Sequence, residues 1–564
     1  MSLRVRLAVG LFVFQCALAQ AQQNTPSRPA VPPLTPEQES ALAAAPKPTE
    51  MFMTTRDGVK LAANVYMPKG AGPYPVVLSR TPYLKDSRLE PLTGRKYTDA
   101  GYVYVDQDVR GKGHSEGVYR AFVNDVEDGY DTVEWAAKQP WSTGKIGITG
   151  ASALGMTSEY AAMAAPPHLT AAYIIVAPYE WLLNTYPGGV LKDADTLGWL
   201  KGQGANQAEL DQVSANVIDN AIWQHTSAAT NGRYIRIPIW YNGGWYDIFD
   251  EGNRWFTYLQ NQGAEGARGN QKLTMSAAGH GGLQGDIEYP QLANLRAPND
   301  EIRWWDYWLK GIDTGIMDEP PVTYFMMGSG RKGHPSEISR VIHAANWPPA
   351  SRATRYFLAP KFTLSTKLPT IVDARLSYKD DPSKPVESVG GANLRNKAGP
   401  MDQRQIPQRA DYLRFETPAL TENVAIAGTV HMELYAATDG ADTDFMVKLV
   451  DVYPDGYEAI VLDAPIRTRF RHGREPGDVQ MMTPNVPERL DIDLWETAIT
   501  FEKGHKIAVH IASTGSPKYE INPNTGEKVG EHTLKPRIAT NTIYFDLSHP
   551  SAMVLPVIYP GLGE

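Results

Sequence analysis

The sequence predicts a parallel α/β domain that carries a helical insertion and is followed by a β-sandwich. Between residues 51 and 346, short apolar runs alternate with segments of helical spacing, which is typical of a parallel sheet covered by helices. After Trp347-Pro348-Pro349, helical periodicity nearly vanishes, and short alternating runs are separated by turn signals such as Pro454-Asp455-Gly456. This second pattern is typical of a β-sandwich.

The α/β domain is expected to consist of residues 51–178 and 235–346. Residues 179–234 contain apolar residues without a strand pattern, and we interpret them as a helical cap because the insertion is longer than one crossover needs. Ordinary crossover helices are the alternative. The β-sandwich is expected to occupy residues 347–564. The predicted strands are 51–55, 59–67, 76–79, 102–106, 145–149, 171–176, 237–241, 272–276, 427–435, 444–452, 459–462, 488–493 and 506–511, and the predicted helices are 128–139 and 154–165.

Residues 1–21 are expected to be a secretory signal peptide. Arg4 and Arg6 precede an apolar run at 7–18, and small-x-small cleavage sites follow. A buried N-terminal helix is the alternative, and it fits this charge order poorly. Residues 22–50 are rich in Pro, Ala and Gln and are expected to form a flexible leader. The sequence therefore predicts export, either to a periplasm or out of the cell. The single cysteine, Cys16, lies in the signal, so no disulfide or thiol nucleophile is expected in the mature chain.

The charge balance and the missing motifs exclude several classes of function. The chain has 54 Lys and Arg against 63 Asp and Glu, a formal charge of −9, and no basic cluster. Nucleic acid and membrane are therefore not expected as partners, because anionic polymers and lipids are bound by clustered cations. No metal or organic cofactor is expected, since His-Glu-x-x-His, a cysteine pair and a phosphate-binding glycine loop are all missing. A small-molecule substrate is expected, and self-association is left open.

The strongest local signal is the segment IGITGASALG at residues 146–155. A β-type run ends in glycine, Ser152 follows at a tight turn, and a helix begins directly after it. This arrangement is typical of a nucleophile elbow, in which the serine hydroxyl is exposed and the next amide, that of Ala153, can donate to an oxyanion. The alternative is that Ser152 is a plain helix N-cap.

A nucleophilic serine needs a base, and the base needs an orienting acid. Asp247 and His280 follow the predicted strands 237–241 and 272–276, in the chain order Ser, Asp, His that is typical of α/β-hydrolases. The carboxyl ends of parallel strands are where such a fold keeps its site. Asp250 is the competing acid. The competing histidines, which lack this order, are His114, His505 and His510.

Several further segments of the sequence carry motifs that are specific enough to indicate a protein family. They read RTPY at 80–83, DVRGKGHSEG at 108–117, DGYD at 128–131, PWSTG at 140–144, GWYD at 244–247, GPMDQR at 399–404, DTDF at 442–445 and DVYPDG at 451–456. With them, the chain from about residue 51 to near its end resembles the X-Pro dipeptidyl-peptidase/cocaine esterase/glutaryl-7-aminocephalosporanic-acid acylase family of serine hydrolases. The resemblance implies an α/β-hydrolase domain with a cap, followed by a jelly-roll domain.

The resemblance also implies residue roles. Ser152 matches the family's nucleophile, Asp247 its orienting acid and His280 its general base. Tyr83 matches the tyrosine that shares the oxyanion hole with the amide of Ala153; from spacing alone, Tyr83 would be taken for a core aromatic. The family's elbow usually has tyrosine directly after the serine. Because alanine stands there, we expect a roomier, more apolar acyl pocket, which weakly disfavours α-amino esters.

The leading hypothesis is an exported serine hydrolase that cleaves an ester or amide through an acyl-enzyme. An X-Pro dipeptidyl-peptidase is the second, with Asp250-Glu251 or Glu180 as candidates to bind the substrate's amino group. The third is a carbohydrate-binding protein whose hydrolase part has decayed, because jelly rolls are common lectin scaffolds.

Overall fold

The computed structural model describes residues 33–218, 220–249, 252–280, 283–289, 295, 297, 299–332, 336–394, 397–531 and 533–559. The chain divides into two compact units, Met1–Ala45 and Pro46–Glu564. The expected signal peptide at 1–21 and the first part of the leader lie outside the described residues. Among the described helices, none combines the length and the apolar character that crossing a membrane requires.

The described part of the first unit corrects one expectation. The flexible leader predicted over 22–50 contains a helix, α1 (Pro36–Ala43). The Thr35 hydroxyl accepts a hydrogen bond from the Gln38 amide at 3.2 Å, and the Gln38 side chain accepts one from the Thr35 amide at 3.0 Å. This reciprocal capping box, with proline at the first helical position, is a local helix-start signal that the high Pro and Ala content obscured.

The second unit begins with a mixed sheet, in which ten strands are described. Their order is β1-β2-β4-β3-β5-β6-β7-β8-β9-β10, parallel from β4 through β9 and antiparallel at both edges. The strands are β1 (Thr49–Thr54), β2 (Lys60–Tyr66), β3 (Tyr74–Thr81), β4 (Val103–Asp108), β5 (Ser142–Ala151), β6 (Leu169–Ile175), β7 (Ile239–Tyr246), β8 (Lys272–Gly279), β9 (Val322–Met326) and β10 (Arg340–Ala344). The strand order reverses beside β3, next to β5, and a reversal of this kind is where open α/β sheets bind ligands.

Helices accompany this sheet, as the alternating pattern predicted. They are α2 (Glu90–Asp99), α3 (Asp125–Ala137), α4 (Ala153–Met163), α10 (Gly252–Gln262) and α11 (Asp300–Trp305). The expected helices at 128–139 and 154–165 correspond to α3 and α4. β7 extends five residues beyond the predicted end at 241, so Asp247 follows the strand directly. The predicted α/β architecture is confirmed.

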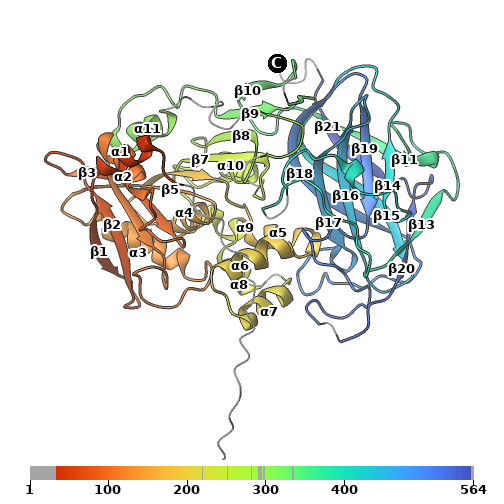
Figure 1. Ribbon diagram of the computed structural model, residues 1–564, viewed down its shortest axis with the longest axis horizontal. Helices are drawn as coiled ribbons and strands as arrows, with labels where there is room; N and C mark the ends of the chain where they lie inside the picture. The colour runs from red at the N-terminus through yellow and green to blue at the C-terminus, as the bar shows by residue number, and fades with distance from the viewer. Residues whose placement is uncertain are drawn as a thin grey trace, which may run out of the picture. The chain divides into compact units, whose positions relative to one another are not determined.

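Between β6 and β7 the described chain is helical and contains no strand. The helices are α5 (Trp181–Thr185), α6 (Gly198–Gly202), α7 (Gln207–Ala215), α8 (Ala221–His225) and α9 (Ala228–Asn231), with a π-helical turn, η2 (Asp193–Leu197), before α6. In Figure 1 these short yellow helices lie beside the lower ends of the blue strands. The backbone of Gly188 comes so close to Pro465 that a Cβ atom there would lie 2.0 Å from the proline carbonyl oxygen.

The remaining strands build the predicted β-rich domain. They are β11 (Arg352–Ala359), β12 (Thr363–Ser365), β13 (Arg375–Asp380), β14 (Leu413–Glu416), β15 (Val424–Thr438), β16 (Asp444–Val452), β17 (Glu458–Arg467), β18 (Glu488–Phe501), β19 (Lys506–Ala512), β20 (Ala539–Tyr544) and β21 (Ala552–Val557). A single parallel pair, Thr363 with Glu416, joins the group around β15 to the group β14-β19-β16-β17 in the described sheet. Buried side chains of both groups, including Leu434 and Val447, belong to one core.

The two sheets of this unit share that core. The same cluster of buried residues contains Ile148 of β5 and Leu434 of β15. Main-chain bonds also cross between the sheets: the Met327 amide donates to the Ala498 carbonyl at 3.0 Å, and the Thr500 amide donates to the Met327 carbonyl at 2.9 Å. Figure 1 shows the two sheets side by side, with β18 next to β7 and β9. The unit is therefore stabilised by burial of apolar surface from both sheets against each other.

Candidate active site

Ser152 occupies a strained turn between β5 and α4. Its backbone has φ 58° and ψ −127°, a left-handed conformation that non-glycine residues rarely adopt. Gly150 makes the turn possible, because a Cβ atom there would lie 2.3 Å from backbone atoms of Leu154. Strain of this kind is typical of a nucleophile elbow, whereas an N-cap residue normally has an extended backbone. Ser152 makes no side-chain cap hydrogen bond either, which argues against the N-cap alternative.

The side chains of Ser152, His280 and Asp247 form a continuous hydrogen-bonded chain. His280 Nε2 lies 2.9 Å from Ser152 Oγ, and His280 Nδ1 lies 3.1 Å from each carboxylate oxygen of Asp247. Because the Asp247 carboxylate can only accept, we assign the proton of neutral His280 to Nδ1, which leaves Nε2 to accept from the serine hydroxyl. The order of the bonds is that of a nucleophile, a general base and an orienting acid.

Asp247 is held in place before any substrate arrives. It is 1% exposed and accepts a further hydrogen bond from the Phe249 amide at 2.8 Å. The Phe249 ring stands edge-on to the His280 imidazole, with ring centroids 5.5 Å apart. Gly244 lets β7 and β8 approach closely, because a Cβ atom there would lie 2.2 Å from the Ala278 carbonyl oxygen. These contacts fix the orientation of the imidazole.

Two hydrogen-bond donors flank the serine. Ala153 is the first residue of α4, where a backbone N–H has no partner within the helix and the helix dipole favours negative charge. Tyr83 Oη accepts a hydrogen bond from Trp199 Nε1 at 2.8 Å, so its own proton remains available to donate. Burial of the phenol raises the pKa of Tyr83, and the hydrogen bonds that the phenol makes with Trp199 and Ser152 only partly oppose this, so the group is neutral at pH 7.

Burial and neighbouring negative charges shift the pKa of the His280 imidazole in opposite directions. Burial lowers the pKa of His280, but the carboxylates of Asp247 and Asp195 together outweigh burial, and the net pKa is raised above 6.5. A raised pKa makes the imidazole a stronger base toward the serine proton. The contribution of Asp195 also indicates that its negative charge lies near the imidazole.

A cavity opens beside Ser152. Most of its wall is apolar, and four aromatic side chains dominate it. The lining residues are Phe122, Ser152, Ala153, Met156, Trp181, Asn184, Lys192, Asp195, Thr196, Trp199, Ile248, Phe249 and Leu394. Phe122 stacks face to face with Trp199 at a centroid distance of 5.5 Å and meets Trp181 edge-on at 5.4 Å. Because Ala153 lines the cavity, the expectation of an apolar pocket beside the nucleophile agrees with this geometry.

The other histidines considered for the general base, and the acid Glu180 considered for binding a substrate amine, already have hydrogen-bond partners. His114 pairs with Glu50, His505 with Asp451 and His510 with Tyr412, at 2.6, 2.9 and 2.9 Å. Glu180 accepts hydrogen bonds from the Ser227 hydroxyl and the Ala229 amide and is not among the residues that line the cavity. Asp250 and Glu251 lie outside the described residues.

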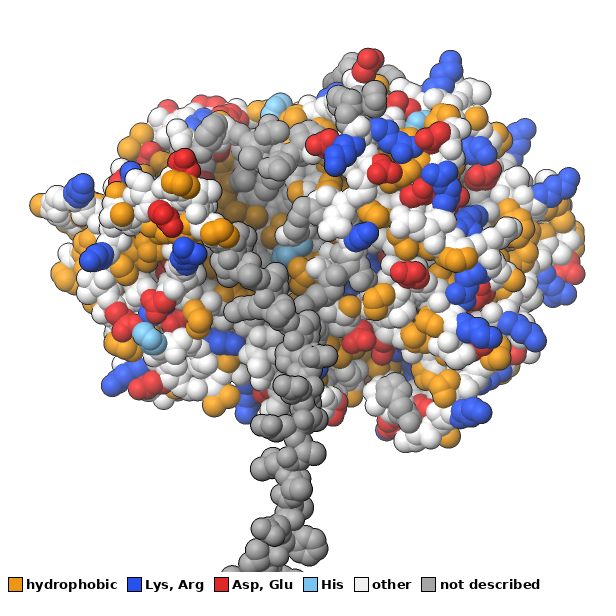
Figure 2. All heavy atoms as spheres, viewed as in Figure 1, with side chains coloured by type: hydrophobic (Ala, Val, Ile, Leu, Met, Phe, Trp, Pro, Cys, Tyr) orange, Lys and Arg blue, Asp and Glu red, His pale blue; other side chains and the backbone are white. Residues whose placement is uncertain are grey.

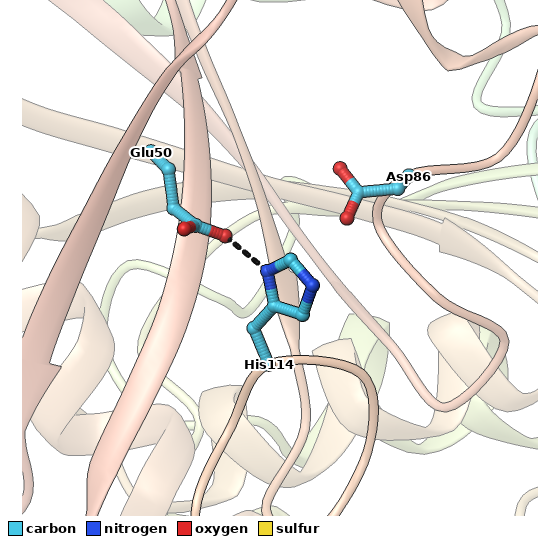
Figure 3. Close-up of side chains that lie close together, drawn as sticks. All are labelled: Glu50, Asp86 and His114. Atoms are coloured by element: carbon cyan, nitrogen blue, oxygen red, sulfur yellow. Dashed lines mark hydrogen bonds and ion pairs between the residues drawn. The ribbon is translucent and has the colours of Figure 1, made fainter.

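Glu50, Asp86 and His114 form the one described group of side chains with metal-ligand geometry (Figure 3). All three are exposed. The Lys85 ammonium already lies 2.7 Å from the Glu50 carboxylate and 3.0 Å from that of Asp86. Since this buried ammonium is ion-paired with both carboxylates, we interpret the group as an ion-pair network. On the face drawn in Figure 2, basic side chains are interspersed with acidic ones.

Comparison with known families places the chain among serine hydrolases. Residues 57–217 match the model of the X-Pro dipeptidyl-peptidase (S15) family, and residues 314–554 match that of the X-Pro dipeptidyl-peptidase C-terminal non-catalytic domain. The chain belongs to the X-Pro dipeptidyl-peptidase family. The resemblance inferred from the sequence motifs is thereby confirmed.

Relatives of this S15 hydrolase extend over nearly its whole length. It is 29% identical to cocaine esterase of Rhodococcus sp., over 90% of this chain and 98% of the relative, and 24% identical to a putative serine esterase of Mycobacterium bovis, over 90% and 95%. A crystal structure of an aminopeptidase from the marine sediment archaeon Thaumarchaeota archaeon has a TM-score of 0.77 at 22% identity, covering 94% of this chain and 99% of that one. An α-amino acid ester hydrolase has a TM-score of 0.73 at 24% identity, covering 95% and 100%.

Most residues that line the cavity were not found from the sequence, and three of them illustrate why. Asp195 and Trp199 lie in the cap, where a lone acid or tryptophan carries no motif signal. Leu394 comes from the C-terminal domain, and its amide donates to Asp195 Oδ1 at 3.0 Å. Leu394 thus brings the C-terminal domain into one wall of the cavity.

Proposed function

We propose that this S15 hydrolase cleaves an ester or amide bond of a small substrate through an acyl-enzyme, with Ser152 as nucleophile. The observation that carries the proposal is the hydrogen-bonded chain from Ser152 through His280 to Asp247 at the edge of an apolar cavity. Two similar proteins described above, cocaine esterase and an α-amino acid ester hydrolase, support ester chemistry.

The proposed reaction follows from the positions of the donors and acceptors. Ser152 Oγ attacks the substrate carbonyl carbon while its proton passes to His280 Nε2, and Asp247 stabilises the resulting imidazolium. The oxyanion is stabilised by the Ala153 amide and the Tyr83 hydroxyl. The bond to the leaving group then breaks, and His280 gives its proton to that group. Water repeats the sequence on the acyl-enzyme, releasing the acid and restoring Ser152 and neutral His280.

We infer a bulky, apolar acyl group, aromatic by preference, as the group that enters the cavity. Phe122, Trp181, Trp199 and Phe249 supply aromatic surface next to the nucleophile, and aromatic pairs gain about 0.5–1.5 kcal/mol beyond the burial of their area. Alanine at position 153 leaves the space beside the serine open.

A panel of chromogenic substrates tests this function. We expect p-nitrophenyl benzoate to be hydrolysed with a higher kcat/KM than p-nitrophenyl acetate, and X-Pro p-nitroanilides to be poor substrates. A dipeptidyl-peptidase would show the reverse order. Turnover of neither class would favour the decayed binding protein. The predicted signal at 1–21 supports the further proposal of export, which the size and location of the mature protein in a cell fractionation would test.

Replacing Tyr83 by phenylalanine tests the oxyanion hole. The loss of one such donor typically costs about 10²- to 10³-fold in kcat. We expect Tyr83→Phe to lower kcat by this factor and to change KM much less, because the phenol donates best to the charge that develops in the transition state. Steady-state kinetics with p-nitrophenyl benzoate measures both values.

Tyr119→Phe is the matched control. The Tyr119 hydroxyl is buried and has no hydrogen-bond partner among the described residues, so its removal should leave kcat near the wild-type value. Equal kinetics for Tyr83→Phe and wild type would place Tyr83 outside the oxyanion hole.

A further inference from the structure

Asp195 has an unpaired carboxylate oxygen at the active-site cavity. The residue is 5% exposed and lines the cavity together with Ser152 and Trp199. Its Oδ1 accepts from the Leu394 amide at 3.0 Å, whereas its Oδ2 is buried and has no hydrogen-bond partner among the described residues. An unpaired, buried carboxylate oxygen is unfavourable, because the charge loses its hydration without gaining a protein donor.

Two other polar side chains that line the cavity, Asn184 and Lys192, already make hydrogen bonds within the protein. Asn184 Nδ2 and Lys192 Nζ both donate to the Ile248 carbonyl, at 2.6 and 3.1 Å, and the Lys192 ammonium also lies over the Trp495 ring, 4.8 Å from its centroid. These contacts hold the side of the cavity near Ile248 together. Asp195 differs from them because its Oδ2 makes no hydrogen bond with any described residue.

The main chain fixes Asp195 at this place. It lies in the π-helical turn η2, between Lys192 and α6, and such turns are frequent at functional sites. Four residues further along the chain, Trp199 donates its indole N–H to Tyr83. The same short segment of the cap therefore contacts the proposed oxyanion hole and places a carboxylate in the wall of the cavity.

We propose that Asp195 is a substrate-recognition residue, whose Oδ2 accepts a hydrogen bond from a hydroxyl or protonated amine on the group that enters the cavity. This inference rests on the function proposed above and specifies its substrate as an ester of an aromatic acid that bears a hydrogen-bond donor. A donor from the substrate satisfies the buried oxygen, and the aromatic walls bury the rest of the acyl group. An acyl group without a donor leaves the oxygen unpaired in the complex, which is how a polar pocket rejects an apolar analogue.

Asp195 also affects the imidazole, and the experiment must separate the two effects. Its negative charge contributes to the raised pKa of His280, so removing it changes the rate for every substrate. Recognition, in contrast, changes only the preference between substrates with and without a donor. The quantity to measure is therefore a ratio of kcat/KM values, in which any common effect on His280 cancels.

The experiment compares p-nitrophenyl esters of benzoic acid, of 3- and 4-hydroxybenzoic acid and of 3- and 4-(aminomethyl)benzoic acid. For wild type we expect at least one donor-bearing ester to exceed the benzoate by about 10- to 100-fold in kcat/KM, the usual effect of a hydrogen bond to a charged group. Asp195→Asn keeps an acceptor for the Leu394 amide but places an NH₂ group at the Oδ2 position, so we expect its ratio to fall to near one. A preference for the hydroxy esters would identify a neutral donor, and one for the aminomethyl esters a cationic donor.

One control variant and a second variant of Asp195 complete the experiment. Asp193→Asn makes the same change in the same turn, at an exposed carboxylate that does not line the cavity, and should keep the wild-type ratio. Asp195→Ala removes the acceptor without adding a donor and should also lose the preference. Equal kcat/KM for all esters in wild type, or an unchanged ratio in both Asp195 variants, would overturn the inference. Failure of wild type to cleave any ester would instead contradict the proposed function, and the inference would fall with it.

Discussion

Ser152→Ala is expected to lower kcat for p-nitrophenyl benzoate by about 10⁴- to 10⁶-fold, the range found when a nucleophile of this class is removed. The residual rate would come from binding and from the two oxyanion donors. The variant should melt at nearly the wild-type temperature, because the Ser152 side chain makes no helix cap and its bond to His280 contributes little to the fold.

The control for this variant lies in α4, the helix that begins directly after Ser152. Ser158 is buried and donates its hydroxyl to the Leu154 carbonyl at 2.7 Å, but it does not line the cavity. Ser158→Ala should therefore keep kcat within a few-fold of wild type. If Ser152→Ala kept a comparable rate, the assignment of the nucleophile would be wrong.

Truncation after residue 349 is expected to abolish soluble, active enzyme altogether. The cut would expose Met327, Trp347 and Tyr246, which are at most 3% exposed in the intact chain. Each buried apolar side chain of this size contributes about 1.5–3 kcal/mol, so the loss from these three is comparable to the margin of roughly 5–15 kcal/mol that stabilises a typical protein. A new apolar surface of this kind also promotes aggregation.

The truncation should also disturb the site itself. The Tyr246 hydroxyl donates to the Ile460 carbonyl at 3.0 Å, directly before Asp247, and the Trp347 indole donates to Glu496 at 2.6 Å. Expression of the fragment 22–349 beside the full chain, followed by size-exclusion chromatography and an esterase assay, measures both effects. A monodisperse fragment with full activity would show that the C-terminal domain supports neither the fold nor the site.

The sequence could predict the parts of the site that depend on strand order. Ser152, Asp247 and His280 each follow a buried strand of the parallel sheet, and neighbouring strands bring their carboxyl ends to one edge. The tight turn at Gly150 was visible as a run of small residues. Asp247 and His280 meet because β7 and β8 are adjacent, so their pairing follows from topology alone.

The cap and the contacts between domains could not be predicted in the same way. Asp195 reaches the cavity through a π-helical turn, a departure from helical spacing that periodicity does not reveal. Leu394 is separated from Asp195 by about two hundred residues, so their contact depends on how the domains pack. The Tyr83 residue as a whole is 40% exposed, and its hydrogen bonds with Trp199 and Ser152 distinguish it from a surface aromatic. Such long-range contacts leave no local pattern.

Labelling with a fluorophosphonate probe tests the central claim most directly, because only a serine activated by a neighbouring base reacts with it readily. After labelling of the full-length protein and proteolysis, mass spectrometry locates the phosphonylated residue. We expect the label on Ser152 alone, with loss of labelling in Ser152→Ala and strongly slowed labelling in His280→Ala. A label on another serine, or an unlabelled protein under conditions where it hydrolyses p-nitrophenyl benzoate, would contradict the account.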